Sequence, residues 1–266
     1  MMPRSAFRTA LITGASAGLG AEYARRLAAA GTDLILVARR LDRLEGLAKE
    51  LGSKHGVRVE AFQADLSTPE GLAAVEGRIA ANPTLDLLIN NAGFGGRTGF
   101  VKGETADHMN MVRVHIEATI RLTKAVLPGM IDRGRGTVIN LSSIAAFSAF
   151  SGAMYSGTKA FLVMFSENLQ DEVRRKGIVI QALCPGMTHT EFHQVAEIDK
   201  SIVPGFFWMT ASQVVRISLR RVGRGVVCVP GWKNKIIAFL MRCPATAAVV
   251  RFVGRTMVVR ARTGEN

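Results

Sequence analysis

Cysteine is scarce in this sequence, and the three residues present are widely separated. Cys184, Cys228 and Cys243 show no C-x-x-C spacing, so neither a disulfide framework nor a zinc site is expected. Because unpaired thiols are usual in a reducing compartment, we expect a cytoplasmic protein. No metal ion is predicted.

Long hydrophobic runs are also missing. No apolar stretch of about 18 residues occurs, so a membrane-spanning helix is not expected. The first residues, MMPRSAFRTALITG, contain no apolar segment before a cleavage site and predict no signal peptide. The chain has 266 residues, 48% of them apolar, and 27 glycines, which predicts one large α/β domain with at most a small appendage.

Acidic residues are nearly absent from the last quarter of the chain. Residues 201–266 contain eleven Lys or Arg and one acid, Glu265, whereas the whole chain has a formal net charge of +13. Such a basic, partly amphipathic segment favours peripheral contact with an anionic membrane surface, and packing on the core with solvated arginines is the alternative. Within residues 251–262, Arg260 interrupts the apolar side of a helical wheel, so the contact should be weak and salt-sensitive. No recognition motif supports nucleic-acid binding.

Apolar runs alternate with helical patterns through the first 185 residues. The runs span residues 9–13, 33–38, 57–62, 85–90, 136–141 and 178–184. The helical patterns lie near residues 18–30, 41–54, 69–81, 105–131 and 155–175, and a further helix and strand are expected at 210–222 and 225–229. Most runs are continuous, as in strands buried on both faces of a parallel sheet. The pattern therefore predicts a doubly wound, mostly parallel α/β sheet of about seven strands with helices on both faces.

A glycine-rich turn, TGASAGLG, joins the first expected strand to the first expected helix. Glycines let the backbone approach a pyrophosphate, whose charge is stabilised at a helix N-terminus. An ordinary tight turn is the alternative, and the Gly-x₃-Gly-x-Gly spacing differs from the common Rossmann pattern. The position between strand and helix favours nucleotide binding. The cofactor residues expected here are Gly14, Ser16, Gly18, Leu19 and Gly20.

Two arginines, Arg39 and Arg40, directly follow the second expected strand, where an acid would bind the adenosine 2′-hydroxyl of NAD. With no carboxylate and two guanidinium groups, the strand end favours a 2′-phosphate, and hence NADPH over NADH. The alternative is that both arginines are only the solvated start of the next helix.

Five motifs follow one another along the chain. They are TGASAGLG, NNAG (90–93), INLSS (139–143), YSGTK (155–159) and CPGMTHT (184–190). In this order and spacing they resemble the short-chain dehydrogenase/reductase family, over residues 8 to about 230. The resemblance implies a Rossmann-type dinucleotide-binding catalytic domain in residues 1–230, with residues 231–266 as a basic extension. It also implies an oxidoreductase that interconverts carbonyl and alcohol groups.

Tyr155 and Lys159 are four residues apart, which places both side chains on one face of a helix. A lysine ammonium near a phenol favours the phenolate, so we expect Lys159 to lower the tyrosine pKa toward neutrality. The resemblance implies that Tyr155 donates a proton to the carbonyl oxygen and that Lys159 also holds the nicotinamide ribose.

A serine at a strand end should polarise the substrate carbonyl. The motif favours Ser143, whereas the distance to the tyrosine favours Ser142. Alternation along the strand sends the two side chains to opposite faces, so only one can serve. We prefer Ser143.

His115 stands where many members of the family have an asparagine that holds a water in a proton relay. A histidine could support the same water with a titratable ring, or it could be hydrogen-bonded inside the core. Both interpretations stay open at this point.

The resemblance implies further cofactor contacts. The residues are Asp65 and Leu66 near the adenine, Asn91, Ala92 and Gly93 near the nicotinamide, and Pro185, Gly186, Thr188 and Thr190 after the sixth strand. For the last group, a simple turn from strand to loop is the alternative.

Apolar residues after the last motif favour a hydrophobic carbonyl or alcohol substrate, with core packing as the alternative for some of them. They are Phe192, Ile202, Val203, Phe206, Phe207, Trp208 and Met209. The resemblance also implies a dimer or tetramer formed through the helices at 105–131 and 155–175.

Two other classes of protein share part of this pattern. A nucleotide-binding regulatory protein of the same fold would lack turnover, and only His115 favours it. A methyltransferase would share the glycine turn without needing Tyr155 and Lys159.

Overall fold

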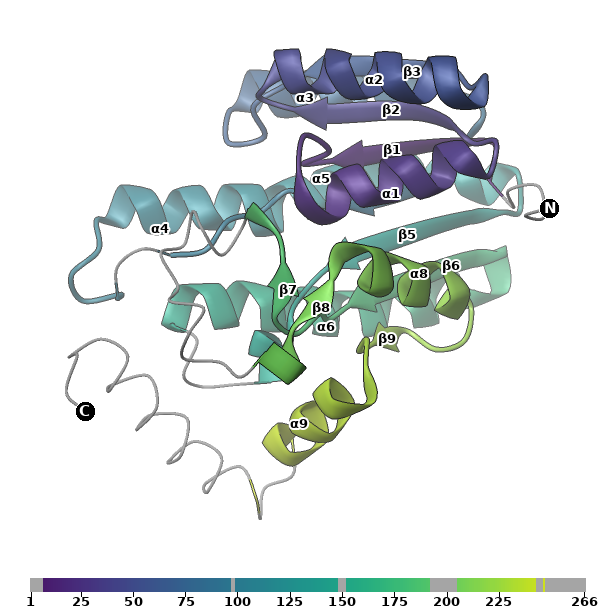
Figure 1. Cartoon of the computed structure of the whole chain (residues 1–266). Helices are drawn as coiled ribbons and strands as arrows, with labels where there is room; N and C mark the ends of the chain where they lie inside the picture. The colour runs from purple at the N-terminus through teal and green to yellow at the C-terminus, as the bar shows by residue number, and fades with distance from the viewer. Residues whose placement is uncertain (1–6, 97–98, 148–151, 192–204, 243–245, 247–266) are drawn as a thin grey trace.

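A seven-stranded parallel sheet forms the centre of the molecule in the computed structural model, which describes residues 7–96, 99–147, 152–191, 205–242 and 246 (Figure 1). The strands are β1 (Thr9–Thr13), β2 (Asp33–Ala38), β3 (Val59–Gln63), β4 (Leu85–Asn90), β5 (Gly136–Leu141), β6 (Ile178–Leu183) and β9 (Val227–Cys228). Their order across the sheet is β3-β2-β1-β4-β5-β6-β9, and neighbouring strands pair in parallel. The predicted doubly wound α/β fold is confirmed.

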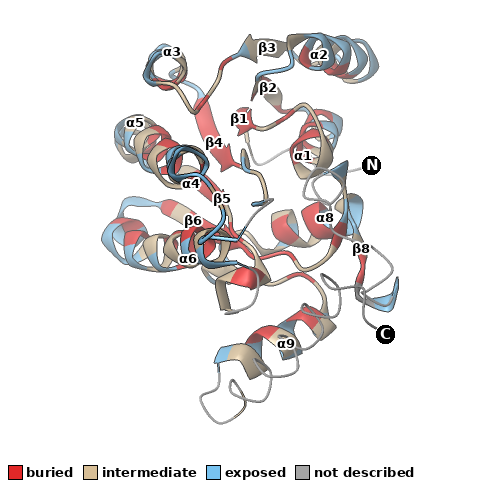
Figure 2. Ribbon diagram, turned by 90° about the vertical axis from the view of Figure 1, so that its left-hand side faces the viewer, coloured by how far each residue is buried: buried red, intermediate tan, exposed pale blue. Residues whose placement is uncertain are grey.

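Helices cover both faces of this sheet (Figure 2). They are α1 (Gly18–Ala29), α2 (Leu41–His55), α3 (Pro69–Ala80), α4 (Thr105–Val112), α5 (Ala118–Asp132), α6 (Ala153–Val173), α8 (Ala211–Arg221) and α9 (Trp232–Arg242). Helices α1, α2 and α8 lie on one face, and α3, α5 and α6 lie on the other. A small second sheet pairs β7 (Thr188–His189) with β8 (Met209–Thr210).

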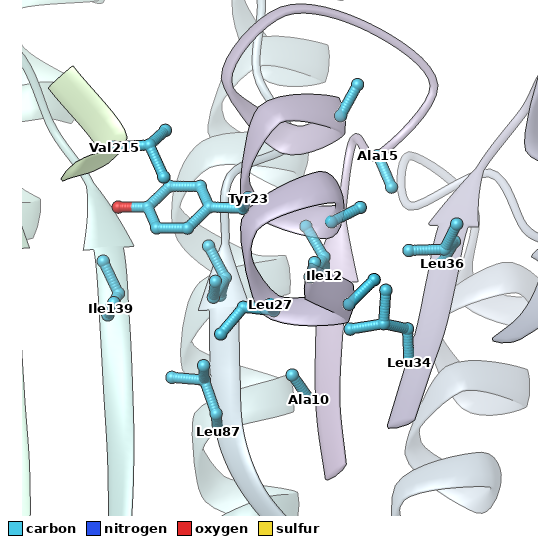
Figure 3. Close-up of a cluster of buried hydrophobic side chains, with 14 of the residues drawn as sticks. Ala10, Ile12, Ala15, Tyr23, Leu27, Leu34, Leu36, Leu87, Ile139 and Val215 are labelled. Carbon is cyan, nitrogen blue, oxygen red and sulfur yellow. The ribbon is translucent and has the colours of Figure 1, made fainter. Parts of the chain in front are cut away.

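The sheet separates two large hydrophobic cores, and alternate side chains of β1 pack into one or the other. Ile12 packs beneath α1 with Tyr23 and Leu36, as Figure 3 shows, whereas the adjacent Leu11 packs with the helices of the other face. The strand β1 is buried along its whole length, which explains its continuous rather than alternating apolar sequence. Burial on both faces fixes where the strands end, and the site residues follow these ends.

The long helix expected at 105–131 has an interruption that the sequence did not predict. A π-helical turn, Arg113–Glu117, separates α4 from α5, and it contains the buried His115. Such wide turns carry one extra residue within a helix and occur often at functional sites. The third strand also begins two residues later than expected, at Val59.

The first helix of the expected C-terminal extension packs on the catalytic domain. Asn234 of α9 is buried, and its amide donates to the carbonyl oxygen of Pro230 at 2.9 Å. A Cβ atom on Gly186 would lie 2.4 Å from Asn234 Oδ1, so α9 touches the turn after β6 directly. Residues 251–262 lie outside the described residues, and the boundary at 230/231 stays a prediction. Within the described part of the chain, no helix combines the length and the apolar character needed to cross a bilayer.

Candidate active site

The glycine turn folds tightly against itself at the start of α1. Gly14 and Gly18 have φ angles of 64° and 57°, a region that favours glycine. A Cβ atom on Gly20 would lie 2.4 Å from the carbonyl oxygen of Gly14, so a larger residue would push the turn open. Ser16 lies within the turn, and Leu19 packs partly against the core beneath α1. A glycine turn of this kind at a helix N-terminus can bind an anionic ligand through its backbone N–H groups.

Asn91 and Thr13 tie this turn to the end of β4. The Asn91 amide donates to the carbonyl oxygens of Thr13 and Gly14 at 2.8 and 3.2 Å. The Thr13 hydroxyl in return accepts the backbone N–H groups of Asn91 and Ala92 at 2.9 and 3.0 Å. Thr13 was not predicted from the sequence as a site residue, although it directly precedes the first glycine of the turn. These bonds bring the NNAG motif and the glycine turn together.

A basic cluster, Arg39, Arg40 and Arg43, lies at the end of β2 and the start of α2. Arg40 donates from Nε and Nη2 to Ser16 Oγ of the glycine turn at 3.3 and 3.1 Å. Arg40 Nη1 and Arg43 Nη1 also donate to the carboxylate of Glu191, at 3.3 and 2.8 Å. Arg43 and Glu191 were missed in the sequence; the ARRLDRL segment shows Arg43, but no local pattern indicates Glu191.

Asp65 and Leu66 have different environments. Leu66 is buried in the core on the α3 side of the sheet. Asp65 accepts hydrogen bonds from the backbone and hydroxyl of Ser67 at 2.9 and 2.7 Å. Burial raises the pKa of Asp65, but the Ser67 hydrogen bonds and the charge of Arg39 outweigh burial and lower the pKa below its ordinary value. Asp65 is therefore ionised at neutral pH.

Tyr155, Lys159 and Ser143 meet at the end of β5 and the start of α6. Tyr155 is half-buried and forms a side-chain hydrogen bond with Ser143. Ser143 Oγ also accepts the backbone N–H of Ala145 at 3.1 Å, which fixes its direction. Lys159 is 4% exposed, and its ammonium donates to the carbonyl oxygen of Leu141 at 2.8 Å. It also lies 5.7 Å from the centre of the Tyr155 ring.

The neighbouring serine, Ser142, points to the opposite side. Its hydroxyl donates to the carbonyl oxygen of Lys159 at 2.7 Å, and the residue is 3% exposed. It also forms a hydrogen bond with the buried thiol of Cys184. Ser142 therefore joins β5 to α6, whereas Ser143 is the serine beside Tyr155.

Burial dominates the protonation of the Tyr155 and Lys159 side chains. It raises the pKa of Tyr155 to about 12, with the Ser143 hydrogen bond acting in the opposite direction. The expectation that Lys159 brings this pKa toward neutrality is wrong for this structure, because loss of hydration is the larger effect. Burial also lowers the pKa of Lys159 to about 8. At neutral pH the tyrosine holds its proton and most of the lysine stays charged.

Both ring nitrogens of His115 are used in hydrogen bonds. The backbone N–H of Phe94 donates to Nε2 at 3.0 Å, which assigns the ring proton to Nδ1. That proton is donated to Thr158 Oγ1 at 3.0 Å, and the Thr158 hydroxyl donates to the carbonyl oxygen of Tyr155 at 3.0 Å. The geometry fits the core interpretation of His115 better than the water-holding one. Burial, and then the charge of Lys159, lower the pKa of His115 well below 6.5, so the ring is neutral.

The segment from Pro185 to Thr190 runs past the glycine turn. The carbonyl oxygen of Pro185 accepts the backbone N–H of Ile144 at 3.0 Å, and the Thr188 hydroxyl donates to the carbonyl oxygen of Gly186 at 2.9 Å. The Thr190 side chain lies 3.3 Å from the place of a Cβ atom on Gly18. Gly93 lies close to the catalytic side, since a Cβ atom there would be 3.0 Å from His115 Nε2.

Part of the expected apolar wall faces inward. Trp208 is 9% exposed and stacks on His189 with a ring separation of 4.8 Å, and Met209 packs partly against the core. Phe206, in contrast, is 60% exposed. The side chain of Phe207 and residues 192–204, with Phe192, Ile202 and Val203, lie outside what the structure describes.

A nicotinamide dinucleotide fits the residues of this site. The glycine turn leaves no room for a Cβ atom at Gly20, and the basic cluster at the end of β2 suits an anionic group. The proton-bearing Tyr155 lies at the opposite end of the same sheet edge, with Ser143 and Lys159. The arrangement can hold a dinucleotide along the carboxyl ends of the strands and transfer a proton at one end.

Comparison with known proteins agrees with this geometry. A serine 3-dehydrogenase of Agrobacterium fabrum is 38% identical over 187 residues, covering 69% of this chain and 73% of that protein. The solved structure of a short-chain dehydrogenase from Sphingobium yanoikuyae in complex with NADPH is 35% identical, with a TM-score of 0.81 and 98% of both chains covered. The bulky-bulky ketone specific alcohol dehydrogenase from Comamonas testosteroni is 29% identical, with a TM-score of 0.78 and the same coverage.

The family model for short chain dehydrogenases matches residues 8–201, which include the glycine turn, the NNAG motif, Ser143, Tyr155 and Lys159. The protein is therefore an NAD(P)-dependent oxidoreductase acting on CH–OH groups, and it belongs to the short-chain dehydrogenase/reductase family.

Proposed function

We propose that this oxidoreductase uses NADPH to interconvert a carbonyl and an alcohol on an apolar substrate. The observation that carries this proposal is the hydrogen bond between Ser143 and Tyr155, with the Lys159 ammonium beside the tyrosine ring. It places a proton donor and a carbonyl-polarising hydroxyl together at the end of β5.

The proposed roles follow from the protonation of these groups. Tyr155 keeps a proton at its phenolic oxygen, because burial holds its pKa at about 12, and donates it to the carbonyl oxygen during reduction. Ser143 Oγ, fixed by the Ala145 N–H, forms a hydrogen bond to the same carbonyl oxygen. The Lys159 ammonium stabilises the phenolate that remains. When bound, the nicotinamide nucleotide supplies the hydride.

Replacing Tyr155 with phenylalanine should remove the proton donor and little else. We expect turnover in Tyr155→Phe to fall about 100-fold or more, while the NADPH Kd changes less than about threefold. Turnover is followed by NADPH absorbance with a panel of ketones and aldehydes, and binding by NADPH fluorescence.

The matched control is Tyr23→Phe, which removes the hydroxyl of the only other tyrosine in the chain, a buried group bonded to Ser218. Turnover per folded molecule should persist in this control. Undiminished turnover in Tyr155→Phe would exclude the mechanism. Nucleotide binding with no turnover on any substrate would favour the regulatory alternative.

The preference for NADPH is supported by the basic cluster and by the sequence that directly follows β2, where Arg39 and Arg40 stand in place of an acidic residue. Arg39 is exposed and lies near enough to Asp65 to lower its pKa, and Arg40 contacts Ser16 of the glycine turn. Guanidinium groups bind a phosphate strongly, but gain nothing comparable from the 2′-hydroxyl of NADH.

Reversing the charge of Arg39 should therefore affect the two nucleotides differently. In Arg39→Asp we expect the NADPH Kd to rise about tenfold or more, with less than about a threefold change for NADH. Fluorescence titration with each nucleotide measures the ratio of the two Kd values. The matched control is Arg174→Asp, which changes an exposed residue elsewhere on the surface. Equal losses for both nucleotides would show that Arg39 does not contact the 2′-phosphate.

An apolar substrate is supported by the surroundings of Ser143 and Tyr155. The whole segment from Ser142 to Thr158 contains no charged residue, and the turn Ile144–Phe147 directly after Ser143 is apolar throughout. Phe94 also lies beside His115, with ring centres 5.5 Å apart. The test compares turnover of bulky ketones with turnover of serine, the substrates named for the Comamonas testosteroni and Agrobacterium fabrum relatives. Turnover of serine alone would contradict the proposal.

His115 is proposed to hold the NNAG loop on the catalytic helix through Phe94 and Thr158, rather than to transfer protons. This arrangement requires the neutral ring, since protonation of Nε2 would break the bond from the Phe94 N–H. The unfolded chain takes up a proton on this histidine near pH 6.5, whereas the folded protein resists it. His115 therefore stabilises the fold above about pH 6.5, and this stabilisation is lost as the pH falls.

The free energy of unfolding should show this difference. Between pH 7.5 and 5.5, the free energy of unfolding should fall by up to about 1.4 kcal/mol more in the protein than in His115→Gln, because the variant has no group to protonate at this position. Urea unfolding at the two pH values measures it, with His55→Gln on α2 as the control. Equal losses in the protein and in His115→Gln would mean that His115 is protonated in the folded state.

A homodimer or homotetramer is supported by an apolar face on α6. Phe161 and Phe165 stack with ring centres 5.6 Å apart, and Met164 on the same helix is 60% exposed. Ile120 of α5 is 40% exposed. A second copy that packs here would remove this apolar surface from water. Light scattering measures the mass in solution, and a monomer at micromolar concentration would contradict the assembly.

Weak contact with an anionic membrane is supported by α9. Trp232, Ile236 and Phe239 are each at least half exposed and recur at helical spacing, and Lys233 and Lys235 lie among them. Co-sedimentation with anionic and neutral vesicles at low and moderate salt measures this contact. Absence from the anionic vesicles at low salt would contradict it.

A further inference from the structure

The carboxylate of Glu191 occupies the basic cluster at the end of β2. It accepts from Arg43 Nη1 at 2.8 Å through Oε1 and 3.0 Å through Oε2, and from Arg40 Nη1 at 3.3 Å. The hydrogen bond from Arg43, with that from Arg40, holds the pKa of Glu191 below its ordinary value. The carboxylate is therefore an anion bound between two guanidinium groups.

This ion pair joins two parts of the site that are far apart in the sequence. Glu191 directly follows Thr190, whose side chain lies against Gly18 of the glycine turn. Arg40 and Arg43 belong to the start of α2, on the adenosine side, where Arg40 also contacts Ser16. The segment after β7 thus reaches across the glycine turn to the basic cluster.

We propose that Glu191 is a specificity-determining residue, whose carboxylate competes with the adenosine 2′-phosphate of NADPH for the guanidinium groups of Arg40 and Arg43. The proposal rests on the cofactor preference proposed above. It also adds Arg43 to the residues that contact the 2′-phosphate.

The competition is selective because only one nucleotide brings an anion to this place. A 2′-phosphate needs the same N–H donors that Glu191 now uses, so binding must exchange one anion for the other. NADH carries a 2′-hydroxyl there and leaves the ion pair intact. The side chains of Arg40, Arg43 and Glu191 are each a little under half exposed, so water and salt weaken the pair and the exchange is feasible.

The size of the effect follows from the strength of exposed ion pairs. Such pairs are weak individually, and two of them to one carboxylate amount to about a three- to tenfold change in an equilibrium constant. Glu191 should therefore weaken NADPH binding about three- to tenfold without abolishing the preference for NADPH over NADH.

The experiment compares nucleotide binding to the full-length protein and to Glu191→Gln, which keeps the size of the side chain and removes its charge. We expect the NADPH Kd to fall about three- to tenfold in Glu191→Gln, and the NADH Kd to stay within about twofold. The matched control is Glu50→Gln, which removes a carboxylate from an exposed ion pair with Arg25 elsewhere on α2. It should change neither Kd. Thermal unfolding of each variant verifies the fold.

A second arm uses Arg43→Gln alone and together with Glu191→Gln. We expect Arg43→Gln to raise the NADPH Kd, and Glu191→Gln to have a smaller effect in this background than in the unchanged protein. An unchanged or raised NADPH Kd in Glu191→Gln would overturn the proposal, and a raised Kd would show that Glu191 orients the arginines instead.

The two proposals fail in different ways. If the unchanged protein binds NADH as tightly as NADPH, and Arg39→Asp weakens both equally, the cofactor preference is wrong. If the unchanged protein prefers NADPH and Glu191→Gln leaves the ratio of the two Kd values unaltered, only the competition is wrong.

Discussion

The contact between the ends of β1 and β4 is the constraint on which the rest of the site depends. The sheet order changes direction here, because β1 has β2 on one side and β4 on the other, and ligands of doubly wound sheets bind at such a switch point. The Thr13 hydroxyl and the Asn91 amide join the two strand ends through backbone groups of both. The glycine turn, the NNAG loop and, through Phe94, His115 are all placed by this junction.

The end of the site that contains Tyr155 and Lys159 depends on burial. Lys159 is nearly inaccessible to water, so its ammonium loses hydration and receives a backbone carbonyl in exchange. The same surroundings keep Tyr155 protonated and His115 neutral. Within one small region, burial thus leaves Tyr155 and His115 neutral, while most of Lys159 stays charged at neutral pH. Electrostatic preorganisation of this kind is established by the fold before any substrate binds.

Much of the fold and part of the site could be predicted from the sequence. Continuous apolar runs located the strands, because burial on both faces removes the alternation of polar and apolar residues from the interior of a strand such as β1. The Tyr155–Lys159 spacing and the glycine turn are local patterns, so both could be recognised from the sequence.

The choice between Ser142 and Ser143 required the direction of each side chain, which depends on a twist of the chain that counting residues does not give. Glu191 and Arg40 are 151 residues apart, and no local signal connects them. The effect of burial on the pKa of Tyr155 could not be predicted either, because it depends on the elements that surround the side chain in the fold.

The π-helical turn at Arg113–Glu117 divides the helix that lines the site into two parts with different registers. Each residue of a helix turns the chain by about 100°, so one additional residue rotates everything before it by that angle relative to α5. Loss of one residue from this turn would leave an uninterrupted α-helix. The packing of α5 on the sheet would stay unchanged. The whole of α4, and the backbone that leads into it from Phe100, would then face another direction. The direction of α4 is thus set independently of α5, by the length of the chain at a single turn.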